Sequence, residues 1–373
     1  MPIYKMEGKK NGIQKYRVRV NYVDAMGHSR QIDRVAYGNA EARELEARLI
    51  RETKEAPPAA SLTVQALYDE YIAVKKNEVR ETTIKKTETT LTIHVLPYLK
   101  DIRIAKLTAP GLQQWKSRIA QNESLSGTTR RNIYGEFRAM LNYAVKMGYL
   151  PKNPIVTVGN FKDAYASAQK EVLHYYTADE FKRYIAVARK TAVTITDWGY
   201  YVFFSIAYYT GMRKGEINAL KWTDIDGDII HVTKSIVQKL KGGDRETPPK
   251  NKSSNRDIQM PLPLIRILEE HKARQQQIEY FTEDFRVCGA IKCLRDTSIE
   301  NKNSEFAKAA GLPHIRIHDF RHSHASLLAN EGINIQEIAR RLGHSKIEMT
   351  WNTYAHLYPR EEERAVQVLN KIV

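Results

Sequence analysis

Residues 318–324 read His-Asp-Phe-Arg-His-Ser-His, and three further short motifs lie around them in the second half of the chain. They are Thr-Gly-Met-Arg-Lys-Gly-Glu at 210–216, Pro-Lys-Asn-Lys-Ser-Ser-Asn-Arg at 249–256 and Leu-Gly-His-Ser at 342–345. Tyr354 follows His344 by ten residues. The order of these motifs along the chain is a more specific signal than any one motif.

Each motif alone has an ordinary explanation. His-x-x-Arg arises by chance in a chain of this length, a partly buried arginine is usually an ion-pair partner, and most of the 21 tyrosines are core or surface residues. One alternative is a metal site formed by His318, His322 and His324, because residues 318 and 322 share a helix face. No His-Glu-x-x-His pattern accompanies them, however.

The motif order Arg, Lys on a hairpin, His-x-x-Arg, Leu-Gly-His, Tyr resembles that of the tyrosine recombinases, the phage integrase family. The catalytic resemblance covers residues 174–373, and the whole layout is similar to the three-domain integrases of phages and conjugative transposons. It implies six catalytic residues, Arg213, Lys250, His318, Arg321, His344 and Tyr354, and two supporting ones, Glu216 and Lys252. Family spacing favours Lys250 over Lys252, in a position usually written Pro-Lys-Thr, where this chain has Asn251.

The resemblance implies cleavage and rejoining of DNA strands with no metal, ATP or other cofactor. Arg213 and Arg321 would clamp the non-bridging phosphate oxygens while the hydroxyl of Tyr354 attacks the phosphorus. A phenol with a pKa near 10 needs a base or positive surroundings, for which the arginines and His318 are candidates. Lys250 would protonate the leaving 5′-oxygen. His344 would bond to the phosphate, and Glu216 would orient its neighbours.

The implied reaction passes through a covalent 3′-phosphotyrosine and a Holliday junction, and it integrates or excises a mobile element. Its partners would be double-stranded DNA with core and arm attachment sites, a tetramer of the chain itself, and a small directionality factor (excisionase). The amphipathic segment after Tyr354 is either a helix on its own domain or a tail that docks on a neighbouring subunit. Three alternatives stay open: a type IB topoisomerase, a non-catalytic DNA-binding regulator and a metal nuclease.

The composition favours a polyanionic partner. The chain has 373 residues, of which 42% are hydrophobic and 27% charged, as in a soluble protein of two or three domains. Eleven of its sixteen net positive charges fall on residues 1–160, although lysine and arginine are also ordinary helix-surface residues. No stretch is long and apolar enough for a membrane span, and residues 1–10 lack the apolar core of a secretory signal. Two cysteines make neither a disulfide framework nor a zinc site. We therefore expect a cytoplasmic protein, acting on DNA in the bacterial cytosol.

Periodicity predicts a multidomain, mainly α fold with three domains. Residues 1–57 read as a small sheet plus a helix, an arm-type DNA-binding domain, with strands at 14–22 and about 29–36 and a helix at 40–54. Residues 62–155 read as a four-helix core-site DNA-binding domain, with helices at 63–74, 82–99, 110–120 and 127–147.

Residues 172–373 read as a mixed, mainly α catalytic domain with a C-terminal tail. A T-x-x-E capping box at 177–180 opens a helix, and the aromatic run 199–209 predicts a buried one. Strands are predicted at 224–237 and 247–260, forming a small antiparallel sheet, and helices at 318–330, 334–342 and 347–356.

Two kinds of DNA contact are predicted in the first half of the chain. Strict alternation over 14–22 puts Lys15, Arg17, Arg19 and Asn21 on an outer strand face, which is either solvated or laid in a DNA groove. Two helix starts gather hydroxyls and cations that suit phosphates, although ordinary capping explains each residue singly. These residues are Thr82, Lys85, Lys86, Thr128, Thr129, Arg130 and Arg131.

Overall fold

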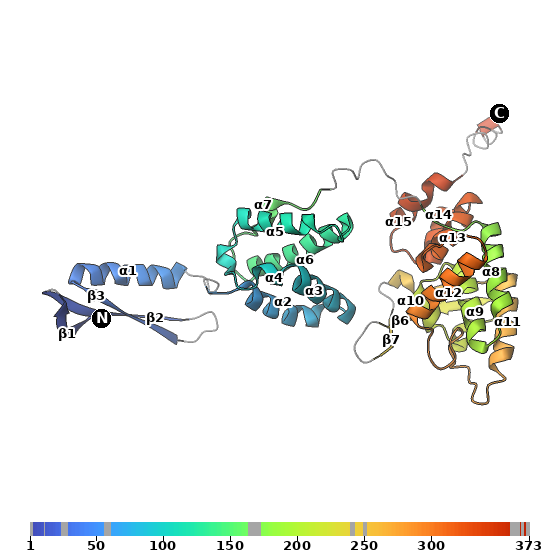
Figure 1. The fold of residues 1–373 in the computed structure, drawn as a ribbon, viewed down its shortest axis with the longest axis horizontal. Coiled ribbons are helices and arrows are strands. Elements are labelled where there is room, and N and C mark those ends of the chain that lie inside the picture. Colours follow the sequence, from blue (N-terminus) through green and yellow to red (C-terminus); the bar gives the residue numbers. More distant parts are fainter. Residues whose placement is uncertain are drawn as a thin grey trace. The chain divides into compact units, whose positions relative to one another are not determined.

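The computed structural model describes residues 3–10, 12–23, 29–55, 61–162, 173–238, 243–248, 252–358, 366 and 369–370. The chain divides into two compact units, Met1–Ala168 and Gln169–Val373. Most of the described elements are helices, and the strands form small antiparallel sheets (Figure 1). The predicted fold class, mainly α with small antiparallel sheets, is therefore confirmed.

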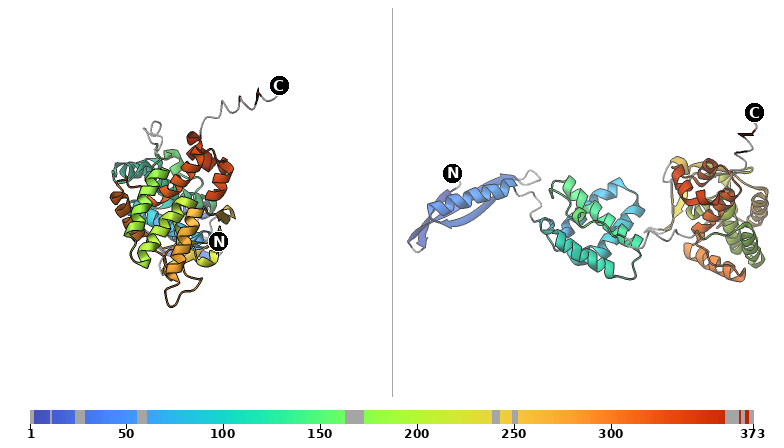
Figure 2. Two further views of the ribbon diagram at one scale, coloured as in Figure 1. Left: turned by 90° about the vertical axis from the view of Figure 1, so that its right-hand side faces the viewer. Right: turned by 90° about the horizontal axis from the view of Figure 1, so that it is seen from above.

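A three-stranded antiparallel sheet opens the first unit, in the order β1 (Ile3–Lys10), β2 (Ile13–Val23), β3 (Ser29–Tyr37). Helix α1 (Asn39–Glu55) lies along this sheet (Figures 1 and 2). Val18 and Val20 of β2 are buried with Ala42 and Leu49 of α1, as the alternation predicted. Strand β1 was not predicted, because its own sequence lacks a regular apolar alternation; it pairs with β2 through the backbone, with a register shift between Lys5 and Lys9.

The rest of the first unit is helical around a core that includes Trp115 and Phe137. Thr63, Thr108 and Ser126 accept backbone N–H groups at the starts of three of its helices. The helix predicted over 82–99, with a stop near Pro97, is divided in two: α3 ends at His94, and a short helix follows with Pro97 in its first turn, where a missing N–H costs nothing. The elements are α2 (Val64–Glu78), α3 (Glu81–His94), α4 (Leu96–Leu99), η2 (Ile104–Lys106), α5 (Ala109–Gln121), α6 (Gly127–Lys146) and α7 (Ile155–Val158).

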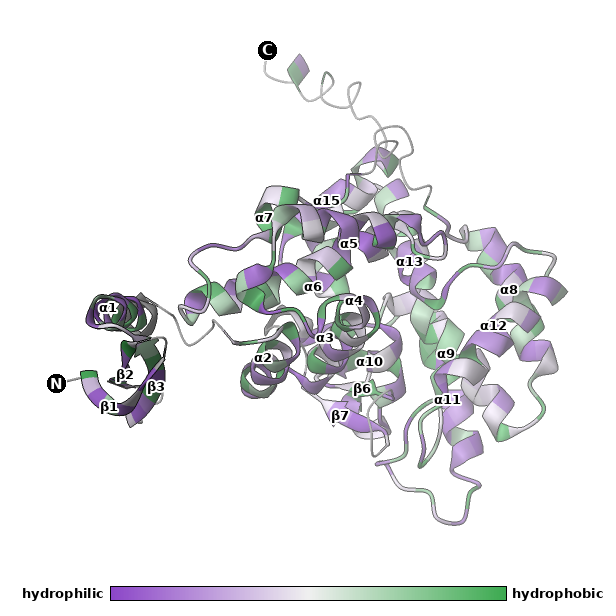
Figure 3. Cartoon of the chain, turned by 60° about the vertical axis from the view of Figure 1, so that its left-hand side comes forward, coloured by the Kyte–Doolittle hydropathy of each residue, from purple (hydrophilic) through white to green (hydrophobic). Residues whose placement is uncertain are grey.

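Helix α9 (Ile195–Thr210) is the centre of the second unit. Every residue from Trp198 to Tyr208 is buried, and Figure 3 colours much of this helix as hydrophobic. The predicted capping box is present at the start of α8, where Thr177 and Glu180 cap each other's backbone. The other helices are α8 (Ala178–Thr191), α10 (Lys214–Ala219), η3 (Trp222–Asp224), η4 (Lys252–Ser254), α11 (Leu262–Gln275), α12 (Asp296–Ala309), α13 (Ile317–Asn330), α14 (Ile335–Leu342), α15 (Ile347–Tyr354) and η5 (Ala355–Leu357).

The two long strands predicted for the second unit were wrong. Short strands form two separate sheets, ordered β4-β5-β8 and β6-β7. Gly227, with φ +54°, turns the chain between β4 and β5, and the Lys234 ammonium bonds to Asp224 where β5 gives way to β6. The strands are β4 (Ile225–Asp226), β5 (Ile229–Val232), β6 (Ser235–Val237), β7 (Arg245–Thr247) and β8 (Arg256–Gln259).

The predicted amphipathic segment after Tyr354 lies outside the described residues, apart from η5, Tyr358 and residues 366, 369 and 370. Among the helices that the structure describes, none is long and apolar enough to cross a membrane.

Candidate active site

A left-handed glycine places the first motif arginine. Helix α9 ends at Gly211, whose φ of +65° favours glycine, and a Cβ there would lie 2.8 Å from the ring of His324. The chain then turns, so that Arg213 caps the start of α10. The end of the buried aromatic helix thus fixes the backbone position of Arg213.

A buried carboxylate holds two guanidinium groups. Arg213 donates to Glu216 (Nη1 to Oε1, 2.8 Å), and Arg256 of β8 donates to the other oxygen (Nη2 to Oε2, 2.9 Å). Burial alone would raise the pKa of Glu216, but Arg256 and Arg213 outweigh it and leave that pKa below its ordinary value. Glu216 is therefore ionised. Removing one partner of such a buried pair typically costs about 3–5 kcal/mol.

Arg321 lies at the same loop as Arg213. Arg321 donates to the carbonyls of Gly211 (2.8 Å) and Leu342 (2.6 Å), and Arg213 donates to the next carbonyl, that of Gly343 (3.3 Å). Burial, with the nearby Arg213 and Arg256, lowers the pKa of Arg321 to about 9, so it stays charged at neutral pH.

The arginines leave unbalanced positive charge. Glu216 offsets only one of the three guanidinium charges of Arg213, Arg256 and Arg321. The side chain of Arg213 is 37% exposed, so an anion from solution can reach it. A phosphate group would supply the missing negative charge.

The motif histidines are neutral. Burial, with neighbouring positive charge, lowers the pKa of both His318 and His344 to about 4. His344 is held by a hydrogen bond between its Nδ1 and the hydroxyl of Thr350 (2.8 Å). The described residues contain no group of three His, Cys, Asp or Glu side chains that could hold a metal ion.

Tyr354 is the last residue of α15, and its hydroxyl is hydrogen-bonded to a histidine. It is 2% exposed and packs against Ala325 and Ile338. Its hydroxyl forms a hydrogen bond of 2.6 Å with Nδ1 of His322. Burial raises the pKa of Tyr354, while the charge of Arg321 acts to lower it. The sequence offered the arginines and His318 as surroundings for this hydroxyl and did not single out His322, although His322 lies directly after Arg321 and one turn beyond His318.

The structure describes the side chain of neither candidate lysine. Lys250 lies outside the described residues, and only the backbone of Lys252 is described, at the start of η4. The structure thus brings together five of the six predicted catalytic residues and leaves the choice between the two lysines open.

The predicted DNA contacts of the first unit fall on accessible positions, with two refinements. Arg17 is exposed, whereas Arg19 pairs with Asp33 at 2.9 Å. Thr82 is no cap: α3 starts after Arg80, and Lys85 and Lys86 are exposed on its first turns. At α6, Ser126 is the cap, and Arg130 and Arg131 bond to the carbonyl of Asn122 and the hydroxyl of Thr128. Asn21 and Thr129 are exposed, and Lys15 is partly exposed.

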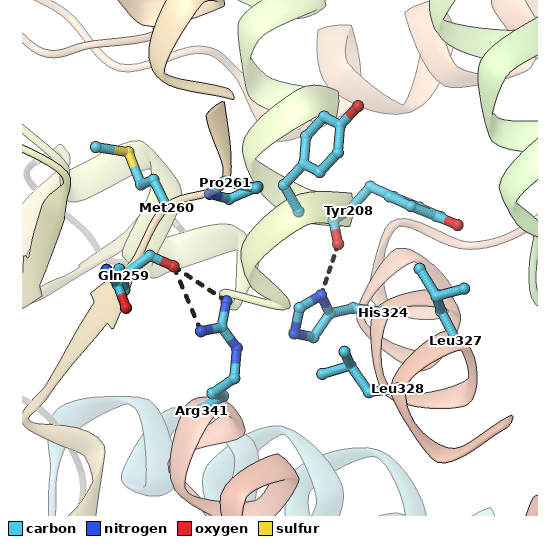
Figure 4. Close-up of a pocket in the computed structure, with 9 residues that line it drawn as sticks. Tyr208, Gln259, Met260, Pro261, His324, Leu327, Leu328 and Arg341 are labelled. Carbon is cyan, nitrogen blue, oxygen red and sulfur yellow. Dashed lines mark hydrogen bonds between the residues drawn. The ribbon is translucent and has the colours of Figure 1, made fainter. Parts of the chain in front are cut away.

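One described pocket lies outside the set of predicted catalytic residues. Its volume is about 380 Å³, and Figure 4 shows His324 and Arg341 on its wall with Tyr208, Met260 and Leu328. His324 donates from Nδ1 to the carbonyl of Tyr208 (2.9 Å). None of the predicted catalytic residues lines it. A small molecule usually binds in an enclosing cavity, whereas an extended polymer can bind at the guanidinium cluster without one.

A family model described as Phage integrase family matches residues 174–361, half of the chain. The chain belongs to the phage integrase family. A second model, Phage integrase, N-terminal SAM-like domain, matches residues 63–119 of this integrase.

Curated relatives of this integrase are themselves integrases and recombinases. The ICEBs1 integrase of Bacillus subtilis (strain 168) is 28% identical over 390 residues, which covers 100% of both chains. A tyrosine recombinase XerC-like protein of Caldanaerobacter subterraneus is 26% identical, over 75% of this chain and 76% of its own. The chain is therefore a tyrosine site-specific recombinase, as its motif order indicated, and neither the topoisomerase nor the regulator alternative is supported.

Solved structures share the fold. The Tn1549 transposon integrase in complex with a circular intermediate DNA has a TM-score of 0.67 and 20% identity, covering 84% of this chain and 100% of that one. A lambda integrase tetramer bound to a Holliday junction has a TM-score of 0.55 and 16% identity, covering 95% and 94%.

Proposed function

We propose that this integrase inserts and excises a mobile element by cutting DNA with Tyr354 inside the cluster of Arg213, His318, Arg321 and His344. The observation that carries the proposal is the shared loop. Arg213 and Arg321 donate to adjacent carbonyls of Leu342 and Gly343, so both guanidinium groups lie next to His344. One phosphate can meet all three side chains.

The residue types fit cleavage of a phosphodiester. Attack on phosphorus builds charge on the non-bridging oxygens, and two preorganised guanidiniums stabilise that charge without reorganising. Glu216 and Arg256 hold Arg213 in place. Tyr354 would take over the 3′ phosphate, and Lys250 would protonate the departing 5′-oxygen. Because the phosphotyrosine keeps the bond energy, a 5′-hydroxyl from another strand can reseal it, and no ATP is needed.

The assembly follows from the number of strand ends. Each protomer holds one Tyr354, so exchange of two duplexes through a Holliday junction needs four copies. The lambda integrase neighbour is a tetramer bound to such a junction, and the Tn1549 integrase is bound to a circular intermediate DNA. We infer the same double-stranded DNA partner here, in the bacterial cytosol, with an excisionase as a further partner that sets direction.

Recombination between two attachment sites tests the function. Purified protein, incubated with a plasmid that carries both element ends, is expected to give recombinant products in EDTA. Supercoiled DNA without those ends should stay supercoiled. Efficient relaxation of that DNA, with no recombinants from the first plasmid, would contradict a recombinase.

Domain roles are part of the same proposal. Residues 1–57 would bind arm sites, residues 62–155 the core site, and residues 172–373 would carry catalysis. Arg17→Glu is expected to weaken binding to an arm-site duplex about tenfold, since charge reversal replaces a phosphate contact by repulsion. Lys190→Glu, the same change on the exposed end of α8, is the control. Gel-shift titrations on separate arm and core duplexes measure both, and a loss confined to the core duplex would contradict the assignment.

The two hairpin lysines can be separated by cleavage rates. Lys250→Ala is expected to slow formation of the covalent adduct about 10²–10⁴-fold, the range for losing a general acid, while Lys252→Ala changes it far less. Single-turnover cleavage of a nicked suicide duplex is the measurement. The reverse order of the two rates would transfer the role to Lys252.

A further inference from the structure

We propose that His322, and not His318, is the base that takes the proton of Tyr354 during cleavage. The inference rests on the proposed function, in which Tyr354 is the nucleophile. It makes His322 a further catalytic residue, because its ring contacts a reacting atom.

The geometry is that of a proton-transfer pair. The Tyr354 hydroxyl and Nδ1 of His322 are 2.6 Å apart, and the two rings are tilted by 50° with centroids 5.8 Å apart. A heavy-atom distance of about 2.6–3.2 Å is what general base catalysis requires. The described structure gives the hydroxyl no other hydrogen-bond partner, so its proton has one acceptor in reach.

The protonation state of the imidazole suits this task. A neutral imidazole carries one ring proton, so Nδ1 can accept the proton of the phenol only in the tautomer with its own proton on Nε2, and the proposal assigns that tautomer to His322. Burial lowers the pKa of His322. Arg316 and Arg321 act in the same direction, Asp319 opposes them, the His318 ring lies one turn away, and Tyr354 faces the ring from α15. The ring is therefore neutral at pH 7, the form that accepts a proton.

His318 has a different position. Its ring meets that of His322 edge to face, at 5.2 Å and 88°, and makes no described hydrogen bond to Tyr354. Arg213 and Arg321 both act on its pKa, so it lies on the side of the guanidinium cluster. His318 is thus left to contact the phosphate, while His322 serves the nucleophile.

Cleavage moves one proton onto His322 and one proton off Lys250. The O–H bond of Tyr354 breaks, its proton moves to Nδ1 of His322, and the phenolate oxygen bonds to phosphorus. The bond from phosphorus to the 5′-oxygen breaks, and that oxygen takes a proton from Lys250. Resealing reverses each transfer, and His322 returns the proton to Tyr354. The bound phosphate offsets the charge of Arg321, which makes the imidazolium easier to form.

His322→Gln separates proton transfer from hydrogen bonding. The amide oxygen still accepts a bond from the Tyr354 hydroxyl but cannot take its proton. We expect adduct formation on a nicked suicide duplex to slow about 10²–10³-fold. His314→Gln is the matched control: that ring is 42% exposed, pairs with Glu300 and should leave the rate unchanged.

A second substrate distinguishes loss of the proton acceptor from loss of the folded active site. A DNA end that carries a 3′-p-nitrophenyl phosphate can be joined to a 5′-hydroxyl strand without Tyr354, because nitrophenolate leaves without a proton. In protein that also carries Tyr354→Phe, which removes attack by the tyrosine itself, His322→Gln should join this end at the same rate as Tyr354→Phe alone. Wild-type cleavage by the variant, or equal loss of cleavage and joining, overturns the inference. Absence of any adduct with the unaltered protein would instead contradict the proposed function.

Discussion

Tyr354→Phe is expected to abolish the covalent protein–DNA adduct while leaving DNA binding unchanged. The substitution removes the oxygen that we propose attacks phosphorus and keeps the ring that packs with Ala325, Ile338 and Leu342. The lost hydrogen bond to His322 should cost only about 1 kcal/mol of stability. Denaturing gels of protein on a nicked suicide duplex measure the adduct, and a gel shift measures binding.

Tyr358→Phe is the matched control for this change. Tyr358 lies four residues further on, in the same cluster, and its hydroxyl donates to the carbonyl of Ile333 (2.6 Å). It should form the adduct at the wild-type rate. Undiminished adduct from Tyr354→Phe would show that another residue attacks the DNA.

Arg213→Lys is expected to slow cleavage about 10²–10³-fold, the usual loss for one preorganised donor at a developing charge. Lysine keeps the positive charge but cannot bridge Glu216 and a phosphate with a planar fork. The side chain is 37% exposed, so the fold should tolerate the change.

Single-turnover cleavage measures this effect, together with thermal unfolding of the variant. Arg189→Lys, which alters an arginine paired with Glu270 outside the site, is the control. A rate for Arg213→Lys within about threefold of the control would mean that bidentate contact with the phosphate is not needed.

Local patterns predicted the parts of this molecule that depend on neighbours in sequence. The capping box at Thr177, the alternation around Val18 and the aromatic run of α9 all hold in the structure. The motif order also indicated which residues gather at the site. The first three features follow from capping and periodicity, whereas the set of site residues was implied by the family resemblance of the motif order.

Other features depend on contacts between distant segments and left no clear pattern. Strand β1 exists because β2 offers it a free edge, and the Glu216–Arg256 pair forms across 40 residues. The contact between His322 and Tyr354 spans 32 residues and needs α13 and α15 to meet. For the same reason the sequence singled out His318 and the arginines as neighbours of this hydroxyl, whereas the structure places His322 against it.

Mapping the DNA-linked residue tests the central claim most directly. Wild-type protein is trapped on a nicked suicide duplex, digested with protease, and the DNA-bound peptide is sequenced by mass spectrometry. The account requires a single linkage, from the Tyr354 oxygen to a 3′ phosphate, and a free 5′-hydroxyl on the released strand. Linkage at Tyr358 or any other residue, or attachment to a 5′ phosphate, would contradict it.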